Sequence, residues 1–214
     1  TEIRPLGIGE FFRRTIASTL LHARRAEFRH FFFGAACEAA NTKRQPYEFA
    51  VGVRAGGDLL VHASRLLHTL FPHFSLIKLD GSNAFNSACR HAMLHELRTN
   101  FLGLAGFFED MYLRHHPEEP GPRILFPCKD GQTRVVWSLQ GTTQGDPGGP
   151  LLFALALHPA LQEIQNRLGE EAYVLAYADD IFLFVPSHQT AEALVTTAQV
   201  LQEMCDLHTN LKKC

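Results

Sequence analysis

Two adjacent acids, Asp179 and Asp180, lie between the short apolar runs Tyr173–Ala176 and Ile181–Val185. Burying one unpaired carboxylate costs several kcal/mol, and two carboxylates side by side also repel each other. Both costs are avoided when the acids lie on the turn of a β-hairpin and bind divalent cations, while the strands bury the flanking apolar side chains. The pattern therefore predicts a metal-binding β-hairpin.

A third acid, Asp80, ends another predicted strand, Phe74–Leu79. Adjacent antiparallel strands lie about 5 Å apart, so pairing of this strand with the hairpin brings three carboxylates to one end of a sheet. Oxygen ligands at this density suit Mg²⁺, with Mn²⁺ as an alternative. Two such ions about 4 Å apart serve an in-line phosphoryl transfer. Taken singly, each acid is more often an ordinary strand-end or turn residue, and only their combination favours metal chemistry.

The elements that must position these acids follow from hydrophobic periodicity and turn signals. This order of elements predicts an α+β fold, with helices packed on one face of an antiparallel sheet of the split βαβ (ferredoxin-like) kind. We expect helices over 9–40, 56–70, 86–100, 101–113, 150–168 and 190–205, and strands over 47–53, 74–79, 123–127, 133–139, 173–176, 181–185 and 207–214.

Composition is that of an ordinary globular chain, with 46% hydrophobic and 20% charged residues among 214. No apolar run is long enough to span a membrane. The five cysteines are scattered without a C-x-x-C pair, which favours a reducing compartment over a disulfide framework. The chain starts without Met or a signal peptide, which indicates a piece of a longer protein.

The charge is distributed unevenly along the chain. Residues 1–70 hold 10 Lys/Arg against 6 Asp/Glu, whereas residues 71–214 hold 10 against 16. A basic part followed by an acidic part suits a phosphate-binding region joined to a cation-binding one. Random surface charge explains the same division equally well.

Five segments, in order along essentially the whole chain, resemble reverse transcriptases. Tyr177-Ala178-Asp179-Asp180 resembles their Y-x-D-D motif, and Leu79–Asn86 resembles the first palm motif in the form found in non-LTR retrotransposons. The motif between these two is similar to Gln144-Gly145-Asp146-Pro147 with Gly149–Phe153. The first fingers motif is similar to Arg4–Ile8 with Arg13 and Arg14, and the lysine-bearing motif after the hairpin is similar to Leu207, Asn210, Lys213 and Cys214.

The resemblance implies the palm of a right-hand polymerase over residues 73–214, with a helix and hairpin insertion at 101–140. A partial, mostly helical fingers region would occupy residues 1–72. We expect this chain to lack the thumb that follows the palm in such enzymes, so this fragment alone is expected to bind duplex weakly and extend primers poorly.

The resemblance also implies roles for individual residues. Asp80, Asp179 and Asp180 would be the catalytic carboxylates and, with the backbone carbonyl of Gly81, the ligands of two metal ions. Tyr177 and Ala178 would lie at the primer terminus. Phe85 would fill the space that a ribose 2′-hydroxyl needs. The nucleotide would be bound by Arg4, Arg13, Arg14, Gly81, Asn83, Ala84, Phe85, Gln144, Gly145 and Lys213.

One position departs from the resemblance. Relatives more often carry an apolar residue where this chain has Gly148, and an extra glycine is expected to loosen that loop.

The resulting hypothesis is the core of an RNA-directed DNA polymerase from a non-LTR retrotransposon. It would use two Mg²⁺ ions, an RNA template, a DNA or RNA primer and deoxynucleoside triphosphates, without a membrane partner. It would act inside the cell, in the nucleus of a eukaryotic host. Three alternatives remain open: a group II intron-like or other reverse transcriptase, an RNA-dependent RNA polymerase, and a nucleic-acid-binding relic without catalysis. The sequence does not indicate the oligomeric state.

Overall fold

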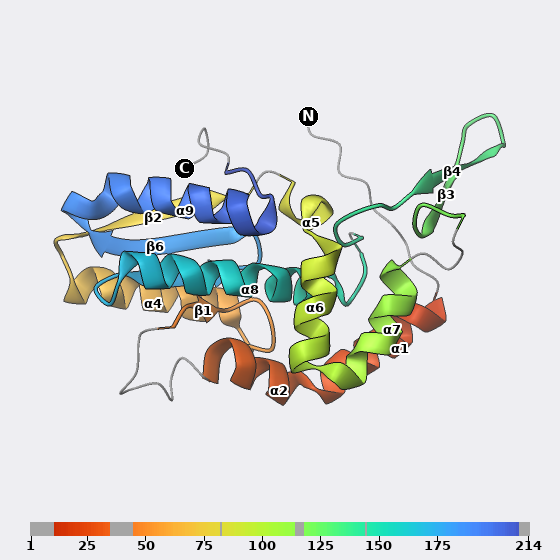
Figure 1. Ribbon diagram of the computed structural model, residues 1–214. Helices are drawn as coiled ribbons and strands as arrows, with labels where there is room; N and C mark the ends of the chain where they lie inside the picture. Colours follow the sequence, from red (N-terminus) through yellow and green to blue (C-terminus); the bar gives the residue numbers. More distant parts are fainter. Residues whose placement is uncertain (1–10, 35–44, 82, 114–117, 144, 210–214) are drawn as a thin grey trace.

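The computed structural model describes residues 11–34, 45–81, 83–113, 118–143 and 145–209. Its main sheet has four strands in the order β1-β5-β6-β2, and two further strands form a separate hairpin, β3-β4 (Figure 1). The strands are β1 (Tyr47–Glu48), β2 (Phe74–Asp80), β3 (Arg123–Pro127), β4 (Thr133–Trp137), β5 (Tyr173–Tyr177) and β6 (Asp180–Pro186). The helices are α1 (Phe11–Ala23), α2 (Arg25–Arg29), the π-helical η1 (His30–Gly34), α4 (Gly56–Leu70), α5 (Ala84–Ser87), α6 (Arg90–Asn100), α7 (Leu102–Tyr112), α8 (Gly149–Leu168), the 3₁₀ helix η2 (Ser187–Gln189) and α9 (Thr190–Cys205).

Strand pairing in the main sheet is antiparallel except at β1. β2 pairs with β6 along its whole length, from Phe74 opposite Pro186 to Asp80 opposite Asp180. β5 and β6 form the predicted hairpin, whereas β1 runs parallel to β5. The strand expected over 47–53 is only two residues long. It ends early because Gly52 has a φ of +72° and because α4 begins close by, where a Cβ on Gly56 would lie 1.8 Å from the carbonyl oxygen of Phe49.

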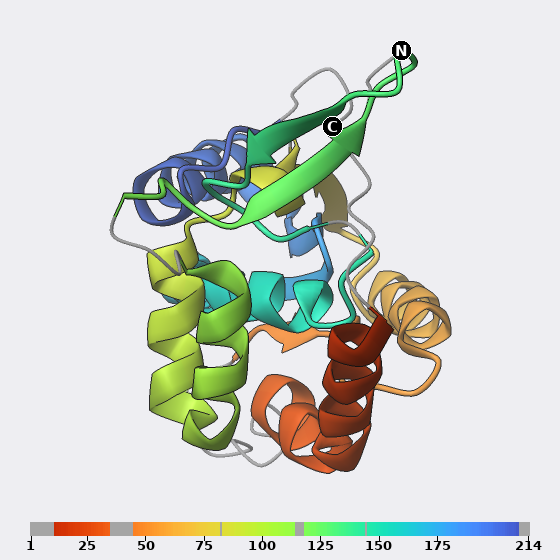
Figure 2. The same cartoon turned by 90° about the vertical axis from the view of Figure 1, so that its right-hand side faces the viewer.

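The sheet is covered on both faces (Figures 1 and 2). Residues that alternate along the strands, such as Leu79, Ile181 and Leu183, join the large core formed with α6, α7, α8 and α9. The opposite face carries Leu175 and Phe184, which pack with Leu60 of α4 in a second, smaller cluster. The sequence interpretation placed helices on one face only, and α4 is the helix that covers the other.

Two further boundaries differ from the expected ones for tertiary reasons. The helix expected over 86–100 is divided, because Ala88 is extended (φ −57°, ψ 139°) and its carbonyl accepts a hydrogen bond from the Gly141 N–H at 2.9 Å. The strand expected over 207–214 appears as one bridge, Gly81 opposite Thr209, and residues 210–214 lie outside the described ranges. No helix in the described part of the chain is both long and apolar enough to cross a membrane.

The N-terminal helices are held against α8 through a histidine. His158 of α8 contacts the ring of Phe31 at a centroid distance of 4.8 Å and that of Phe32 at 5.6 Å. Burial lowers the pKa of His158 from 6.5 to about 4, because the imidazolium loses its hydration in this apolar contact. The folded protein therefore contains neutral His158 at neutral pH.

This burial predicts an acid-dependent loss of stability. The unfolded chain takes up the His158 proton near pH 6.5 but the folded chain only near pH 4, so the free energy of unfolding falls as the pH drops from about 6.5 to about 4. The fall attributable to this group is up to about 3 kcal/mol. Urea titrations across this range should show a weaker pH dependence for His158→Leu than for wild type. The exposed His188→Leu serves as control, and an unchanged pH dependence in His158→Leu contradicts the assignment.

Candidate active site

The two adjacent acids lie at the turn between β5 and β6. Tyr177 and Asp180 are the last paired residues of the hairpin, so Ala178 and Asp179 form a two-residue turn. Ala178 has a φ of +56°, a region that favours glycine and costs other residues about 1 kcal/mol or more. A tight hairpin turn requires such a residue, and the short side chain of alanine fits it better than a branched one.

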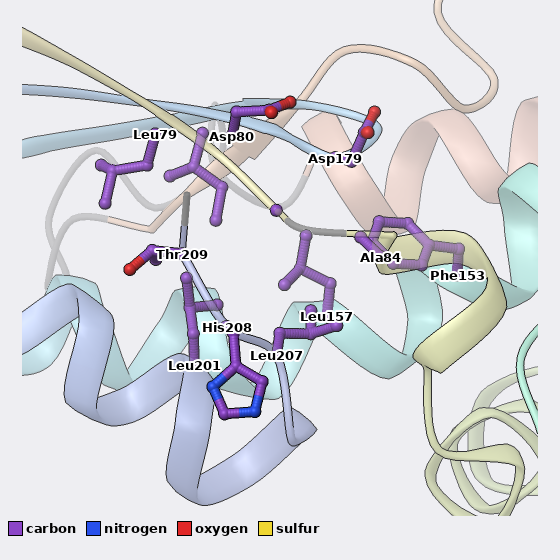
Figure 3. Close-up of a pocket in the computed structure, with 12 residues that line it drawn as sticks. Leu79, Asp80, Ala84, Phe153, Leu157, Asp179, Leu201, Leu207, His208 and Thr209 are labelled. Carbon is purple, nitrogen blue, oxygen red and sulfur yellow. The ribbon is translucent and has the colours of Figure 1, made fainter. Parts of the chain in front are cut away.

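The third acid joins this turn through strand register. Asp80 ends β2 directly opposite Asp180, as the sequence predicted. The carboxylates of Asp80 and Asp179 lie on the same side of the strand ends, turned away from the apolar floor formed by residues such as Leu157 and Leu207 (Figure 3). The pocket beneath has a volume of about 10 Å³, which is the room that one water molecule needs. A ligand larger than water therefore does not fit beneath the acids and can approach them only from their open side.

Asp180 forms an ion pair with a lysine of β2. Its Oδ1 lies 3.0 Å from Lys78 Nζ, and the Lys78 ammonium also lies 5.7 Å from the ring centroid of Phe182. Within the described ranges, no group of three His, Cys, Asp or Glu side chains is arranged to hold a metal ion. The three acids thus meet at one end of the sheet, but Asp180 is directed to a lysine.

The donor set at this edge suits a hard divalent cation. Asp80 and Asp179 offer carboxylate oxygens, and Gly81 lies close enough that a Cβ on it would be 3.9 Å from the Asp179 carbonyl oxygen. Oxygen-only donors with one or two carboxylates are typical of Mg²⁺ sites that keep several waters and share substrate phosphates. The residues present therefore fit Mg²⁺ or Mn²⁺ bound through Asp80, Asp179 and the Gly81 carbonyl.

Phe85 is held firmly beside this edge. Its ring is stacked on the buried ring of Phe153, with centroids 4.4 Å apart and planes at 21°. Its carbonyl accepts the Thr142 N–H at 2.7 Å. Just before it, Asn83 has a φ of +51°, and its Oδ1 accepts a hydrogen bond from Asn86 Nδ2 at 2.7 Å. The ring therefore has a fixed position.

The loop that leads to Gly145 and Asp146 lies against α5, the short helix that contains Phe85. Gly141 is packed so closely that a Cβ on it would be 2.2 Å from the Asn86 carbonyl carbon. The structure thus brings two segments of the predicted nucleotide site together, the one around Phe85 and the one leading to Gly145. Gln144 lies outside the described residues, as do Arg4 and Lys213.

Asp146 fixes the end of this loop. Its carboxylate accepts hydrogen bonds from the Gly148 N–H at 3.1 Å and from the Tyr112 hydroxyl. Burial and the nearby Asp146 charge raise the pKa of Tyr112 far above its ordinary value, so the hydroxyl keeps its proton. Gly148, which was expected to loosen the loop, is instead buried, and a Cβ on it would lie 2.1 Å from the Phe108 ring. The glycine makes room for that ring.

Arg90 anchors the other end of the loop to α6. Its guanidinium donates to the carbonyl oxygens of Gly141, Tyr112, Ser138 and Gln140 and to the Ser138 hydroxyl, at 2.5–3.3 Å. It also lies 5.2 Å from the Tyr112 ring centroid. The segment 138–141, which joins β4 to the Asp146 loop, is therefore hydrogen-bonded to one buried cation.

The two arginines of α1 have different surroundings. Arg13 lies 3.9 Å from Asp110 of α7, whereas Arg14 is exposed and makes no ion pair with any described residue. The sequence does not indicate which of the two arginines would bind a phosphate. Because Arg13 is paired with Asp110, Arg14 is the guanidinium more available to an anion.

Glu48 is the buried acid that sequence reasoning missed. It is 2% exposed, and its Oε1 accepts N–H groups from Ala50 at 2.6 Å and from Ala178 at 3.4 Å. Burial raises its pKa from 4.5 to about 7, although the two backbone hydrogen bonds oppose the shift. One signal was present, since Glu48 is the only charged residue in the apolar run Tyr47–Val53. No comparable local signal marked Arg90 or Tyr112.

Residues 51–214 match the family model described as "Reverse transcriptase (RNA-dependent DNA polymerase)". Among curated proteins, the "Retrotransposable element SLACS 132 kDa protein" of Trypanosoma brucei gambiense is 27% identical over 145 residues, which are 61% of this chain. The "Retrovirus-related Pol polyprotein from type-2 retrotransposable element R2DM" of Drosophila melanogaster is 26% identical over 153 residues, or 69% of the chain. The chain spans only 11% and 14% of the length of these two relatives.

Solved structures with a similar fold include two yeast telomerases. The apo telomerase of Candida tropicalis superposes with a TM-score of 0.60 at 12% identity, over 94% of this chain and 36% of that one. The telomerase of Candida albicans, in complex with a TWJ fragment of telomeric RNA, gives a TM-score of 0.57 at 10% identity, over 94% and 35%. At these identities the likeness concerns the fold, which is the α+β fold that the sequence predicted.

Proposed function

Since the chain belongs to the reverse transcriptase family, we propose that it carries the site at which a non-LTR retrotransposon protein adds deoxynucleotides to a primer 3′-hydroxyl on an RNA template. The observation that carries the proposal is the register of β2 and β6, which sets Asp80 opposite Asp180 and beside the Asp179 turn. Similarity to two retrotransposable-element proteins supports the retrotransposon context.

The proposal assigns the acids to metal binding and the residues of the hairpin turn to the primer end. Asp80, Asp179 and the Gly81 carbonyl hold two divalent cations, and Asp180 completes the carboxylate set on release from Lys78. The bound cations would stabilise the attacking and leaving oxygens of the in-line transfer. The primer end lies against Tyr177 and Ala178.

The remaining predicted residues bind the incoming nucleotide. Phe85 lies against its sugar, and the same nucleotide contacts Asn83, Ala84, Gln144 and Gly145. Arg4, with Arg13 or Arg14, neutralises the triphosphate, because guanidinium groups bind phosphate oxygens bidentately; the ion pair of Arg13 with Asp110 favours Arg14 of the two. Lys213 protonates the pyrophosphate that leaves.

We also propose residues 1–72 as a partial fingers region and 73–214 as the palm, with 101–140 as a helix and hairpin insertion within the palm. The elements of the second part form the main sheet apart from β1, with α8 and α9 packed on it. The protein would act inside the cell, in the nucleus where the host is a eukaryote, because its DNA product and target lie there.

A template and substrate exchange tests the proposal. The full-length protein that carries this chain should extend a primer on RNA with deoxynucleotides in Mg²⁺ or Mn²⁺, and should stop when EDTA is added. Extension with ribonucleotides alone indicates an RNA-dependent RNA polymerase instead. Binding of template-primer without any extension indicates a relic, and either result refutes the proposed reaction.

Phe85 provides a prediction about sugar selection. Phe85→Val shortens the side chain next to the sugar while Phe153 still fills the core, so ribonucleotide incorporation should rise about 10- to 100-fold relative to deoxynucleotide incorporation. The measurement is kcat/KM for each nucleotide on the same RNA template. Phe107→Val, which alters a half-buried phenylalanine of α7, is the control. An unchanged preference in Phe85→Val removes Phe85 as the selecting residue.

A further inference from the structure

A buried carboxylate contacts the backbone of the turn that bears Asp179. Glu48 Oε1 accepts the Ala178 N–H at 3.4 Å across 130 residues of sequence. The same oxygen accepts the Ala50 N–H at 2.6 Å. Its other oxygen, Oε2, is buried and has no hydrogen-bond partner in the described part of the chain. An acid with so little compensation for its lost hydration is costly to keep in a core.

The surrounding segment fixes this carboxylate against the turn. Glu48 is paired with Ala176 in the parallel β1-β5 ladder, and the Phe49 N–H donates to the Ala176 carbonyl at 2.9 Å. Immediately after, the start of α4 closes on the same hairpin, where a Cβ on Gly57 would lie 3.7 Å from the Tyr177 ring. The turn is thus supported from outside its own hairpin by residues 48–57.

Ala178 needs such support because of its backbone conformation. A positive φ in a residue other than glycine persists only where the surroundings hold it, and the hydrogen bond from the Ala178 N–H to Glu48 is a contact that does so. Asp179 follows directly, so the direction of its carboxylate depends on the peptide that Glu48 holds. A displacement of about 1 Å at a reacting group lowers a rate by up to about 100-fold.

We propose that Glu48 is a positioning residue of the polymerase site, which orients the Asp179 carboxylate by accepting the Ala178 N–H. Glu48 touches no substrate; it acts through the turn. The proposal rests on the function proposed above for Asp179. The positioning role requires a side-chain oxygen at residue 48 that accepts the Ala178 N–H. Glutamine supplies such an oxygen as well as glutamate does.

The test compares Glu48→Gln with Glu48→Leu in the full-length protein. Rapid-quench primer extension separates two quantities, since the burst amplitude counts correctly folded active sites and the burst rate reports the transfer step at each of them. Glu48→Gln should keep the burst rate within about threefold of wild type. Glu48→Leu should lower it about 10- to 100-fold, with the KM for deoxynucleotide changed by less than about threefold.

A matched control separates positioning from mere stability. Gln165 is also a buried polar residue that contacts the hairpin: it lies on α8, and its Oε1 accepts the Val174 N–H near the start of β5. Gln165→Met should lower the melting temperature and the burst amplitude but leave the burst rate per active site unchanged. A normal burst rate in Glu48→Leu overturns the proposal, and so does an equal loss in Glu48→Gln, which would implicate charge rather than the acceptor.

Asp179→Asn is run alongside to tell the two proposals apart. If Asp179→Asn extends primers as wild type does, the proposed function of Asp179 fails and the Glu48 proposal fails with it. If Asp179→Asn is inactive while Glu48→Leu has a normal burst rate, only the Glu48 proposal fails.

Discussion

Replacement of Asp80 or Asp179 by asparagine is expected to lower the rate of primer extension by about 1,000-fold or more. Each change keeps the side-chain shape but removes a negative charge that divalent cations need, and loss of one preorganised electrostatic contact already costs about 100- to 1,000-fold. The measurement is single-turnover extension on an RNA template over a range of Mg²⁺ concentrations. Part of the loss should be recovered at high Mn²⁺, because this ion tolerates a poorer ligand set.

Asp130→Asn is the matched control for these two variants. Asp130 lies at the β3-β4 turn, where its Oδ1 accepts the Gln132 N–H at 3.0 Å, and asparagine offers the same acceptor. Its extension rate should equal that of wild type. Undiminished extension by Asp80→Asn or Asp179→Asn would refute the assignment of the metal site, even if the protein proved to be a polymerase.

The second large effect is expected on stability. Arg90→Leu removes a buried cation that satisfies four backbone carbonyls, and leaving buried acceptors unpaired is costly. The free energy of unfolding should fall by about 3 to 5 kcal/mol, which corresponds to a drop of about 10 °C in melting temperature for a domain of this size. Urea and thermal unfolding measure the two quantities.

Arg98→Leu provides the comparison, because Arg98 lies on the same helix but its ion pair with Glu109 is half exposed. Exposed pairs contribute about 1 kcal/mol or less, so this variant should remain close to wild type. If Arg90→Leu were as stable as Arg98→Leu, the Arg90 hydrogen bonds would not be what joins α6 to the Asp146 loop.

The sequence predicted the elements whose signals are local. α4, α9, the β3-β4 hairpin and the β5-β6 hairpin lie within a few residues of their expected bounds, because periodicity, Asp-Gly and the acid pair are all read within one short window. The meeting of Asp80 with the hairpin was also predicted, since Asp80 ends one apolar strand and Asp179 and Asp180 lie between two others. Membership of the reverse transcriptase family was expected from five ordered motifs and is confirmed.

The features that were missed depend on contacts between distant segments. Nothing near Ala88 foretells that Gly141 will hydrogen-bond to it and divide a helix. The parallel pairing of β1 and the covering of the second sheet face by α4 depend on how the chain folds back after Gly52. Gly148 was interpreted from its own flexibility, whereas its role is set by Phe108. The direction of Asp180 towards Lys78 likewise involves a charge in another strand.

The pairing of β2 with β6 also determines how late in synthesis the three acids can come together. The two acids that face each other in this ladder are separated by 100 residues of chain, and ribosomes add about 5 to 20 residues each second. Once Asp80 has been made, β2 therefore waits about 5 to 20 seconds for its partner strand, with its hydrogen-bonding groups open to other partners. A nascent chain that stops short of β6 holds Asp80 without its partner strand, so the three acids come together only once the hairpin has been synthesised and has paired with β2.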